Sequence, residues 1–362
     1  MAEEAKSAIE VVELLKKVEL GLIPDDEMKS FIRIELERRL QWGYKPTHHQ
    51  QLSQVLNFAD SLRGMDIAMD VSSVDWQLYN APISFLNIIH GRIIKESCCY
   101  FEDDSVTVEE AAVAMMDLYC ERAKIEDGQR VLDLGCGLGA LTMHIAGKYN
   151  NCRVTGITTS PSQKQFIEDQ CLKHNLLNVE IILADVITLE MDQTFDRILA
   201  IELFEHMKNY ELLLRKISKW MTSDGFLFVE HLCHKAFPCH FEPLDETDWI
   251  TNYAFPAGTI TMPSAHFLLY FQDDVSIANH WTISGNHCSR THEELLKRMD
   301  EKANAVEAII ESFLGSKESA RKWISYCRVL HLLSIELFKY NNGEEWMISH
   351  VLFKRKTVHS NM

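Results

Sequence analysis

The stretch VLDLGCGLGALTMHIAGKYNNCRVTGITTS, residues 131–160, contains an apolar strand, a glycine-rich turn, a helix and a second strand. Three glycines, Gly135, Gly137 and Gly139, stand between the first strand and the helix. At such a turn, glycine allows the backbone to approach a ligand closely. The pattern therefore predicts the first strand–helix–strand unit of a ligand-binding sheet, with the ligand at the turn.

The end of the second strand indicates the kind of ligand. Dinucleotide-binding domains hold the ribose with a carboxylate about 20 residues after the glycines, whereas this strand ends in GITTS, with hydroxyl side chains. Asp185 ends the third strand in ILADV, where it could receive an adenine amino group, and Asp133 precedes the glycines. These features favour S-adenosylmethionine over a dinucleotide. The alternative is that the glycines only let a helix pack on a strand.

Further strands and helices alternate along the chain. Apolar strands are predicted at 130–135, 153–158, 179–185, 195–201 and 225–231, and helices at 138–149, 160–175 and 210–221. Short apolar strands alternating with helices are typical of a parallel, doubly wound sheet. We therefore expect an α/β fold whose Rossmann-like sheet is built mainly from residues 130–232.

The flanking regions are predicted to be mostly helical. Over residues 1–125 apolar side chains recur every three or four positions, and Thr107 with Glu110 makes a capping box. Helices are also expected over 292–315 and 319–340, followed by a last strand. The expected organisation has four parts: an N-terminal helical cap or lid (1–125), a cofactor-binding core (126–232), a substrate-binding cap with C-terminal helices (233–345), and the last sheet strand with a tail (346–362).

Composition narrows the choice of partner. The chain has 53 acidic and 36 basic residues and a net charge of −17. A field of that sign repels nucleic acid and anionic membranes and attracts cations, so a cationic small molecule is the expected partner. The charged N-terminus shows no signal-peptide pattern, and the ten cysteines are interpreted as reduced thiols. These two observations predict a cytoplasmic protein. The acidic charge predicts that it binds neither nucleic acid nor a membrane.

The stretch IELFEHMKN, which follows the fourth predicted strand, supplies Glu202, Glu205 and His206. Ligands of such folds bind at this edge of the sheet. An amine with a pKa of about 10 is protonated at neutral pH, so methyl transfer to its nitrogen requires a proton acceptor. His206 suits a general base, and Glu205 would attract the ammonium. If a helical turn begins here, Glu202 and His206 share a face. The alternative is a solvated helix start.

Two further clusters, one of histidines and cysteines and one of aromatic residues, contain residue types that are typical of binding sites. HLCHKAFPCH, residues 231–240, contains three histidines and two cysteines, but no pair has the spacing of structural zinc sites, so no metal is expected. Aromatic residues gather after the fifth strand, and most should belong to the core. Phe255 and Trp281 are the two that we expect to line an apolar pocket able to accept a cation.

Several longer motifs carry a resemblance to a known family. KESCCYFE (95–102), ITTSPSQKQFI, IELFEHMKNYELLLRKI and NNGEEWMISHVLFKRK resemble the plant coclaurine N-methyltransferase family, which is itself similar to the bacterial cyclopropane fatty acid synthases. The resemblance spans nearly the whole chain. It implies the class I S-adenosylmethionine-dependent methyltransferase fold, with a seven-stranded sheet, an antiparallel last strand, a helical N-terminal region and an inserted cap. The caps are expected to open and close over the ligands.

The resemblance also implies roles for individual residues. Ser97 and Tyr100 would hold the methionine end of the cofactor, Thr159 and Gln163 would contact the ribose, and Ile201 would lie beneath the sulfonium. The implied catalytic residues are Glu205 and His206, with Glu202 nearby. The full set of expected cofactor-binding residues is Ser97, Tyr100, Asp133, Gly135, Gly137, Thr159, Gln163, Asp185, Val186 and Ile201, and that of substrate-binding residues is Tyr79, His231, Phe255, Trp281, Tyr326 and Cys327.

This chain departs from its relatives at three places. Relatives commonly have Glu where this chain has Asn80, next to Tyr79, so a carboxylate near the substrate amine is missing. Many have Trp where this chain has Cys327, which removes an aromatic wall of the pocket. The cyclopropane synthases use a Cys where Ser334 stands, which argues against lipid cyclopropanation.

The sequence therefore predicts an S-adenosylmethionine-dependent N-methyltransferase that acts on a secondary or tertiary amine of an alkaloid. Coclaurine-like benzylisoquinolines are the leading acceptors, and protoberberine, pavine, reticuline or phenylalkylamine acceptors are alternatives. A lipid-methylating enzyme and a non-catalytic binding module are the competing hypotheses from other classes. A homodimer is possible, since closed dimers are the commonest oligomers of such proteins.

Overall fold

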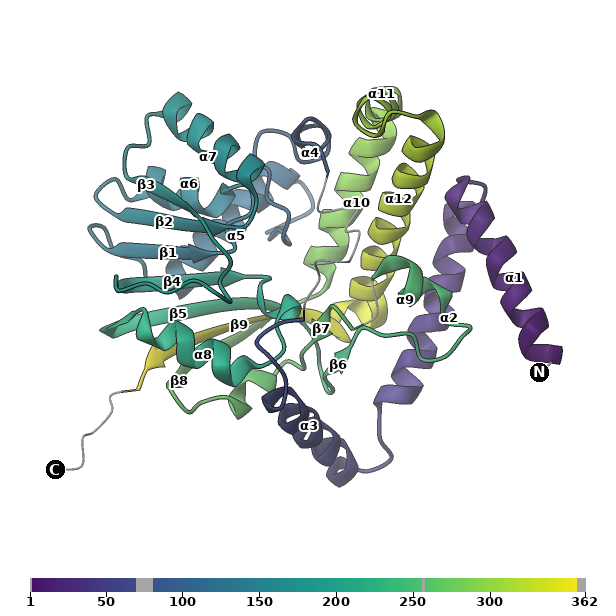
Figure 1. The fold of residues 1–362 in the computed structure, drawn as a ribbon, viewed down its shortest axis with the longest axis horizontal. Helices are drawn as coiled ribbons and strands as arrows, with labels where there is room; N and C mark the ends of the chain where they lie inside the picture. Colours follow the sequence, from purple (N-terminus) through teal and green to yellow (C-terminus); the bar gives the residue numbers. More distant parts are fainter. Residues whose placement is uncertain (1, 70–80, 256–257, 357–362) are drawn as a thin grey trace.

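The centre of the protein is a seven-stranded sheet with the strand order β3-β2-β1-β4-β5-β9-β8 (Figure 1). The computed structural model describes residues 2–69, 81–255 and 258–356. β1 to β5 run parallel, and β9 is inserted antiparallel between β5 and β8. The predicted α/β methyltransferase sheet and its antiparallel last strand are therefore confirmed. The strands are β1 (Arg130–Leu134), β2 (Arg153–Thr158), β3 (Val179–Leu183), β4 (Phe195–Ile201), β5 (Met221–His234), β8 (Val275–Ile283) and β9 (Trp346–Arg355).

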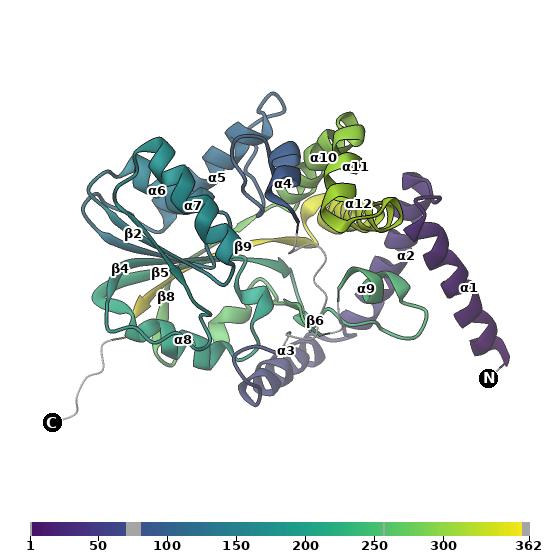
Figure 2. The same cartoon turned by 45° about the horizontal axis from the view of Figure 1, so that its top comes forward.

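Apolar side chains cover both faces of the central strands, as the continuous hydrophobic runs predict. On one face, Val131, Leu199 and Phe228 pack with α5 and α6. On the other face, Leu132 and Ile198 pack with α3 and α8. Figure 2 shows the sheet between these two layers. The helices are α3 (His48–Arg63), α5 (Val108–Arg122), α6 (Ala140–Lys148), α7 (Pro161–His174) and α8 (Tyr210–Lys219).

Local signals define where two of these helices begin. The Thr107 side chain accepts the N–H of Glu110, and the Glu110 carboxylate accepts the N–H of Thr107, so the predicted capping box is formed. At α7 the Ser160 side chain accepts the N–H of Gln163, and Pro161 occupies the first turn. Both helices therefore start where the sequence alone places them.

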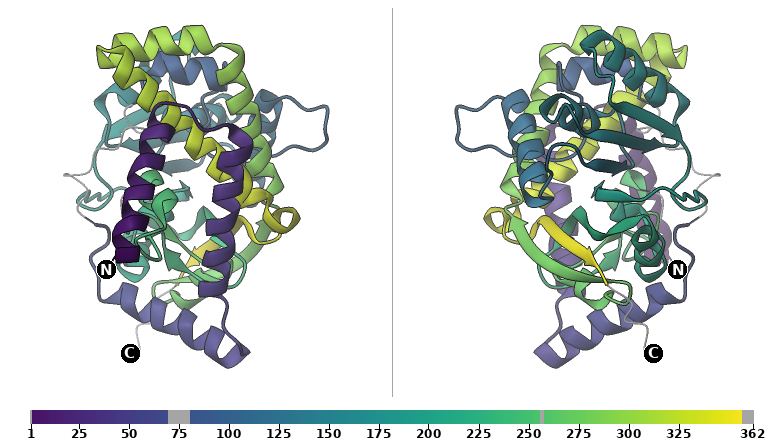
Figure 3. Two further views of the ribbon diagram at one scale, coloured as in Figure 1. Left: turned by 90° about the vertical axis from the view of Figure 1, so that its right-hand side faces the viewer. Right: turned by 90° about the vertical axis from the view of Figure 1, so that its left-hand side faces the viewer.

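The remaining helices form a layer beside the C-terminal ends of the parallel strands (Figure 3). α12 contacts α1, α2, α10 and α11 and is the centre of this layer. The Arg328 guanidinium joins three of them, because it pairs with Asp25 of α2 at 2.6 Å and with Asp300 of α10 at 2.5 Å. The helices are α1 (Ala2–Glu19), α2 (Asp25–Gly43), α4 (Ile83–His90), α9 (Trp249–Ala254), α10 (Asn286–Glu301), α11 (Ala303–Leu314) and α12 (Lys317–Lys339). Shorter elements are β6 (Cys239–His240), β7 (Thr261–Met262), η1 (Phe204–His206), η2 (Phe267–Tyr270) and η3 (Tyr340–Gly343).

Two expectations about elements need correction. The single helix predicted over 292–315 is broken at Lys302, whose φ of −116° and ψ of 26° end α10 and let α11 take a new direction. β8 is a strand that the sequence pattern does not predict. It lies at the sheet edge and is largely half-buried or exposed, so it lacks the apolar run that marks a central strand.

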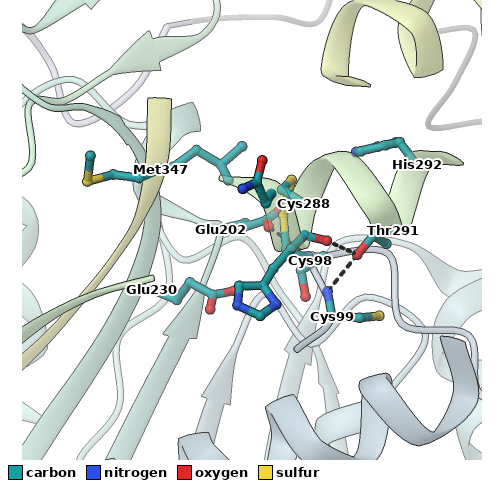
Figure 4. Close-up of a disulfide and its surroundings, with 12 residues drawn as sticks. Cys98, Cys99, Glu202, Glu230, Cys288, Thr291, His292 and Met347 are labelled. Carbon is teal, nitrogen blue, oxygen red and sulfur yellow. Dashed lines mark hydrogen bonds between the residues drawn. A yellow bond between two sulfur atoms is a disulfide. The ribbon is translucent and has the colours of Figure 1, made fainter. Parts of the chain in front are cut away.

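The expectation of ten reduced thiols is also wrong for two cysteines. Cys98 and Cys288 form a disulfide across a sequence separation of 190 residues, with their Cα atoms 4.8 Å apart. The bond ties the segment 95–101 to α10 (Figure 4). The other eight cysteines are free and buried.

Over the described ranges, no helix combines the length and the apolar character needed to cross a membrane.

Candidate active site

Side chains of neighbouring elements pack closely against the glycine turn after β1. Gly135, Gly137 and Gly139 all have positive φ, between 53° and 76°, a conformation that favours glycine. A Cβ on Gly139 would lie 2.7 Å from a side-chain carbon of Ile167 on α7, so only glycine fits there. A Cβ on Gly135 would lie 3.3 Å from Leu203. The turn therefore keeps an accessible backbone next to the loop that follows β4, as an amino-acid-bearing cofactor requires.

Asp133 is buried directly before the turn. Its carboxylate accepts the hydroxyl of Thr142 at 2.6 Å, which ties β1 to the first turn of α6. Burial raises the pKa of Asp133 to about 6, although hydrogen bonds from Thr142 act in the opposite direction. The structure thus shows Asp133 as a support of the turn.

The ends of β2 and β3 present the residues expected to contact the adenosine part. The hydroxyl of Thr158 donates to Gln163 Oε1 at 2.6 Å, which leaves the Gln163 amide N–H groups for a ligand. Thr159 is exposed. Asp185 accepts the N–H of Ile187 with Oδ1 at 2.8 Å, and Val186 is buried beside it.

The segment 95–101 lies across the C-terminal end of β4. Its Lys95 ammonium donates to Ser97 Oγ at 2.6 Å, and the Tyr100 ring stacks on His287 of α10 with ring centroids 4.5 Å apart. The N–H of Cys98 donates to Glu202 Oε1 at 3.1 Å. The segment therefore connects two predicted cofactor-binding residues to a predicted catalytic residue.

Glu202 occupies a constrained position after β4. Its φ of +49° lies in the left-handed region, which costs a residue other than glycine on the order of 1 kcal/mol or more. Its N–H donates to the carbonyl of Glu230 at 3.0 Å. Burial and the negative charge of Glu230 raise the pKa of Glu202 to about 7. The helical turn η1 begins only at Phe204, so the predicted shared helical face of Glu202 and His206 is not formed.

Glu205 lies within η1, and only 4% of it is exposed. Its Oε1 accepts the N–H of Leu232 at 2.6 Å, whereas its Oε2 is buried without a hydrogen-bond partner among the described residues. Burial, followed by the charge of Glu202, raises its pKa well above the usual range. A buried carboxylate oxygen without a partner indicates that a ligand group belongs there.

His206 is the next residue along the same turn. Burial and the nearby Lys208 lower its pKa to about 4, so its imidazole is neutral at neutral pH. A neutral imidazole can accept a proton, but the lowered pKa makes it a weaker base than an ordinary histidine.

Glu230 on β5 was not selected from the sequence. Its carboxylate is fully buried and accepts the Tyr119 hydroxyl at 2.6 Å and the proton of His350 Nε2 at 2.5 Å. Figure 4 shows it beside Glu202 and Cys98. A single carboxylate within the apolar run FLFVEH was the signal that could have revealed it.

The predicted substrate residues separate into groups. The Tyr326 hydroxyl donates to the carbonyl of Ala254 at 2.8 Å, next to Phe255, whose ring packs edge-on against Phe241 at 5.1 Å. Trp281 lies on β8 with the Arg122 guanidinium 5.0 Å from its ring centroid. Cys327 is buried in the core, and Tyr79 lies outside the described residues.

His231 on β5 is fully buried. Its Nδ1 donates to the carbonyl of Leu232 at 3.0 Å, and its Nε2 is buried and unpartnered within the part of the chain that the structure describes. Since adjacent strand residues point to opposite faces, His231 lies on the sheet face opposite Glu230.

The cluster HLCHKAFPCH is dispersed by the fold. His234 pairs with Glu345 at 3.1 Å, whereas His240 lies 3.3 Å from Thr261 Oγ1. In the described ranges, no three His, Cys, Asp or Glu side chains are grouped so that they could hold a metal ion.

Known proteins resemble this chain in sequence and in fold. A family model described as mycolic acid cyclopropane synthetase matches residues 71–336. The (S)-coclaurine N-methyltransferase of Thalictrum flavum subsp. glaucum is 59% identical over 352 residues, which cover 97% of each chain. Pavine N-methyltransferase of the same plant is 55% identical over 346 residues, 96% of this chain and 97% of that one. A crystal structure of coclaurine N-methyltransferase bound to N-methylheliamine and SAH is 60% identical, covers 95% of this chain and 99% of that chain, and has a TM-score of 0.94.

Proposed function

This chain belongs to the plant coclaurine N-methyltransferase family, and on that premise we propose that it methylates the amine nitrogen of a benzylisoquinoline-type alkaloid, with S-adenosylmethionine as the methyl donor. The observation that carries the proposal is the Oε2 of Glu205, which is buried and has no hydrogen-bond partner among the residues that the structure describes. Glu205 lies two residues after Leu203, which borders the glycine turn. A carboxylate oxygen in that position suits a cationic amine.

The residues present fit the cofactor. The open backbone at Gly135 and Gly137, with Ser97 and Tyr100 of the segment 95–101, would hold its amino-acid end. The Gln163 amide would reach the ribose, and further residues would frame the adenine and the sulfonium: Thr159, Asp185, Val186 and Ile201. When bound, S-adenosylmethionine supplies an electrophilic methyl group on a positively charged sulfur.

Proton removal is the chemical task of the protein side chains. A secondary ammonium has no lone pair, so a proton must leave its nitrogen before the N–C bond can form. Glu205 Oε2 is the proposed acceptor, and the neutral imidazole of His206 is the second. An ammonium next to Glu205 favours the ionised carboxylate, because an opposite charge lowers a raised carboxyl pKa. Glu205 and His206 would also hold the nitrogen in line with the methyl group, which supplies much of the acceleration.

Coclaurine-like secondary amines are the first candidates, and pavine, protoberberine, reticuline and phenylalkylamine acceptors are alternatives. Ser334, which replaces the Cys of the cyclopropane synthases, disfavours a lipid substrate. The tightly packed glycine turn and the buried carboxylates disfavour a non-catalytic binding module.

A labelled-methyl assay with a panel of amines and phospholipid vesicles tests the proposal. We expect label in a tetrahydrobenzylisoquinoline secondary amine and none in phospholipid. Label in phospholipid alone would contradict the proposed substrate class. Cofactor binding without methylation of any compound in the panel would support the binding-module hypothesis instead.

Three other expectations from the sequence stay predictions. They are the cytoplasmic location, a homodimer, and the four-part division at residues 125, 232 and 345. Light scattering of the purified chain tests the dimer, and limited proteolysis with mapping of the cleavage sites tests the division.

A further inference from the structure

We propose that Glu230 is a positioning residue for the methyl transfer: its buried carboxylate holds Lys95, and through Lys95 the segment that carries Ser97 and Cys98, against Glu202. The inference rests on the proposed function, which it deepens by assigning a residue to the support of the cofactor and of the catalytic carboxylates.

Three elements of the fold meet at Glu230. The carboxylate comes from β5, the Tyr119 hydroxyl that it accepts comes from α5, and the His350 imidazole comes from β9. None of these three side chains is measurably exposed. Because the carboxylate links a helix and two strands, a change in it is transmitted to all of them.

Arg122 fixes the protonation of His350, and His350 in turn affects the charge of Glu230. The Arg122 guanidinium lies 2.7 Å from His350 Nδ1. Arginine can only donate, so Nδ1 accepts, and the imidazole proton is on Nε2, which donates to Glu230. A neutral His350 agrees with its pKa, which burial lowers. Burial acts to raise the pKa of Glu230, but His350, Lys95 and Tyr119 outweigh it and lower that pKa, so the carboxylate is ionised.

Lys95 is a buried cation close to the same group of side chains. Lys95 is only 5% exposed, and its ammonium lies over the Tyr119 ring, 5.2 Å from the centroid. It donates to Ser97 Oγ at 2.6 Å and to the carbonyl of Cys98. A buried ammonium needs a nearby anion. The Tyr119 hydroxyl is hydrogen-bonded to the Glu230 carboxylate, and the Lys95 charge lowers the pKa of Glu230. We infer that the Lys95 contacts to the cofactor-binding segment depend on this carboxylate.

Backbone hydrogen bonds connect the segment 95–101 and Glu230 to Glu202. The Cys98 N–H donates to Glu202 Oε1 at 3.1 Å, and the Glu202 N–H donates to the carbonyl of Glu230 at 3.0 Å (Figure 4). Glu202 therefore receives one contact from each side of the same network. The charged or titratable groups that face Glu202 are Lys95, Glu96 and Cys99 from the segment, Glu205 from η1, Tyr119 from α5 and Glu230 from β5.

Glu345 offers a matched control. Like Glu230, it is a buried carboxylate bound by a histidine and a tyrosine, here His234 and Tyr44, and it also pairs with Lys235. It lies beside η3, whose Asn341 also donates to it, and its other partners are Tyr44, which follows α2, His234 of β5 and Lys235. Glu345→Gln therefore reproduces the loss of a buried charge outside the proposed site.

The experiment compares Glu230→Gln and Glu345→Gln in the full chain. For Glu230→Gln we expect the KM for S-adenosylmethionine and the Kd for S-adenosylhomocysteine to rise roughly tenfold to a hundredfold, as misplacement of a supporting group does. We also expect the acidic limb of the pH–rate profile to move to lower pH, because Glu202 loses a neighbouring negative charge. Glu345→Gln should leave the KM, the Kd and the profile unchanged.

A third readout depends on neither cofactor nor activity. Lys95 should react faster with an amine-specific reagent in Glu230→Gln, monitored by peptide mass spectrometry, and not in Glu345→Gln. If the alkaloid panel shows no methylation, this readout and the Kd still test the inference, so the two proposals fail separately. If Glu230→Gln does not fold, Tyr119→Phe removes one bond to the same carboxylate and should raise the Kd in the same direction. Equal Kd values and equal Lys95 reactivity across the variants would overturn the proposal.

Discussion

The two oxygens of Glu205 have different tasks. Oε1 accepts the N–H of Leu232 and so holds η1 against the end of β5, whereas Oε2 is buried with no partner in the described part of the chain. One oxygen therefore fixes the side chain while the other stays available for the amine. His206 follows in the same turn as a neutral imidazole. Position and chemistry are thus combined in one residue.

We predict that Glu205→Gln lowers kcat by about a hundredfold or more and leaves folding nearly unchanged. The Gln side-chain oxygen still accepts the Leu232 N–H, but the amide nitrogen cannot accept a proton. A labelled-methyl assay and thermal unfolding of the same preparation measure both effects. Glu190→Gln, at an exposed carboxylate paired with Lys216, is the surface control.

His206→Ala should also lower kcat by about a hundredfold. Near-normal turnover in both His206→Ala and Glu205→Gln would remove proton acceptance from the roles of this turn.

Two links join elements that are distant in the sequence. The Cys98–Cys288 disulfide ties the segment 95–101 to α10, and Glu345 ties the start of β9 to Tyr44 at the end of α2. The disulfide holds α10 to the segment that carries Ser97 and Tyr100, and Glu345 holds the end of α2 to the sheet. Their removal is expected to affect stability before it affects the chemical step.

Reduction of the disulfide should destabilise the protein. A cross-link between positions this far apart contributes about 2–4 kcal/mol, chiefly by restricting the unfolded chain. We expect dithiothreitol to lower the unfolding midpoint of the unsubstituted protein and to leave that of Cys288→Ser unchanged. Cys171→Ser, at a free cysteine on α7, should respond to dithiothreitol like the unsubstituted protein. An equal response of all three would show that the bond does not stabilise the fold.

Glu345 should contribute a pH-dependent part of the stability. Burial acts to raise its pKa, but the hydrogen bonds from His234, Lys235 and Tyr44 outweigh burial and lower the pKa from 4.5 to about 2. A lowered folded-state pKa gives stability that is present above pH 4.5 and lost as the pH falls towards 2. Glu345→Gln should therefore cost about 1.5–3 kcal/mol at neutral pH. In urea unfolding, the difference between the two proteins should shrink as the pH falls from 5 to 3.

The charge of the whole molecule acts on its substrate. With a net charge of −17, the protein attracts a cationic amine at long range, and salt screens that attraction. We expect the KM for the amine to rise severalfold between roughly 20 and 300 mM salt. The Kd for S-adenosylhomocysteine, which carries no net charge at neutral pH, is the internal control. An amine KM that is independent of salt would show that only contacts inside the site recognise the cation.

The sequence by itself determined the elements whose signals are local. The glycine turn, the central strands and the start of α5 depend on backbone freedom, apolar runs and a capping box spanning four residues, all of which are readable along the chain. The family resemblance supplied the antiparallel orientation of β9, whereas the stretch IELFEHMKN at the end of a predicted strand already indicated Glu202, Glu205 and His206. The roles of these residues stay predictions that the proposed variants test.

The remaining features depend on neighbours that are distant in the sequence. β8 is an edge strand with a register shift between Ile277 and Asn279, so it carries no strong apolar pattern. The disulfide requires two Cα atoms 190 residues apart to come within 4.8 Å. The ionised state of Glu230 depends on partners from α5, β9 and the segment 95–101. Burial and proximity of this kind arise only when the chain is folded, because the energies involved depend on distances in space and not along the chain.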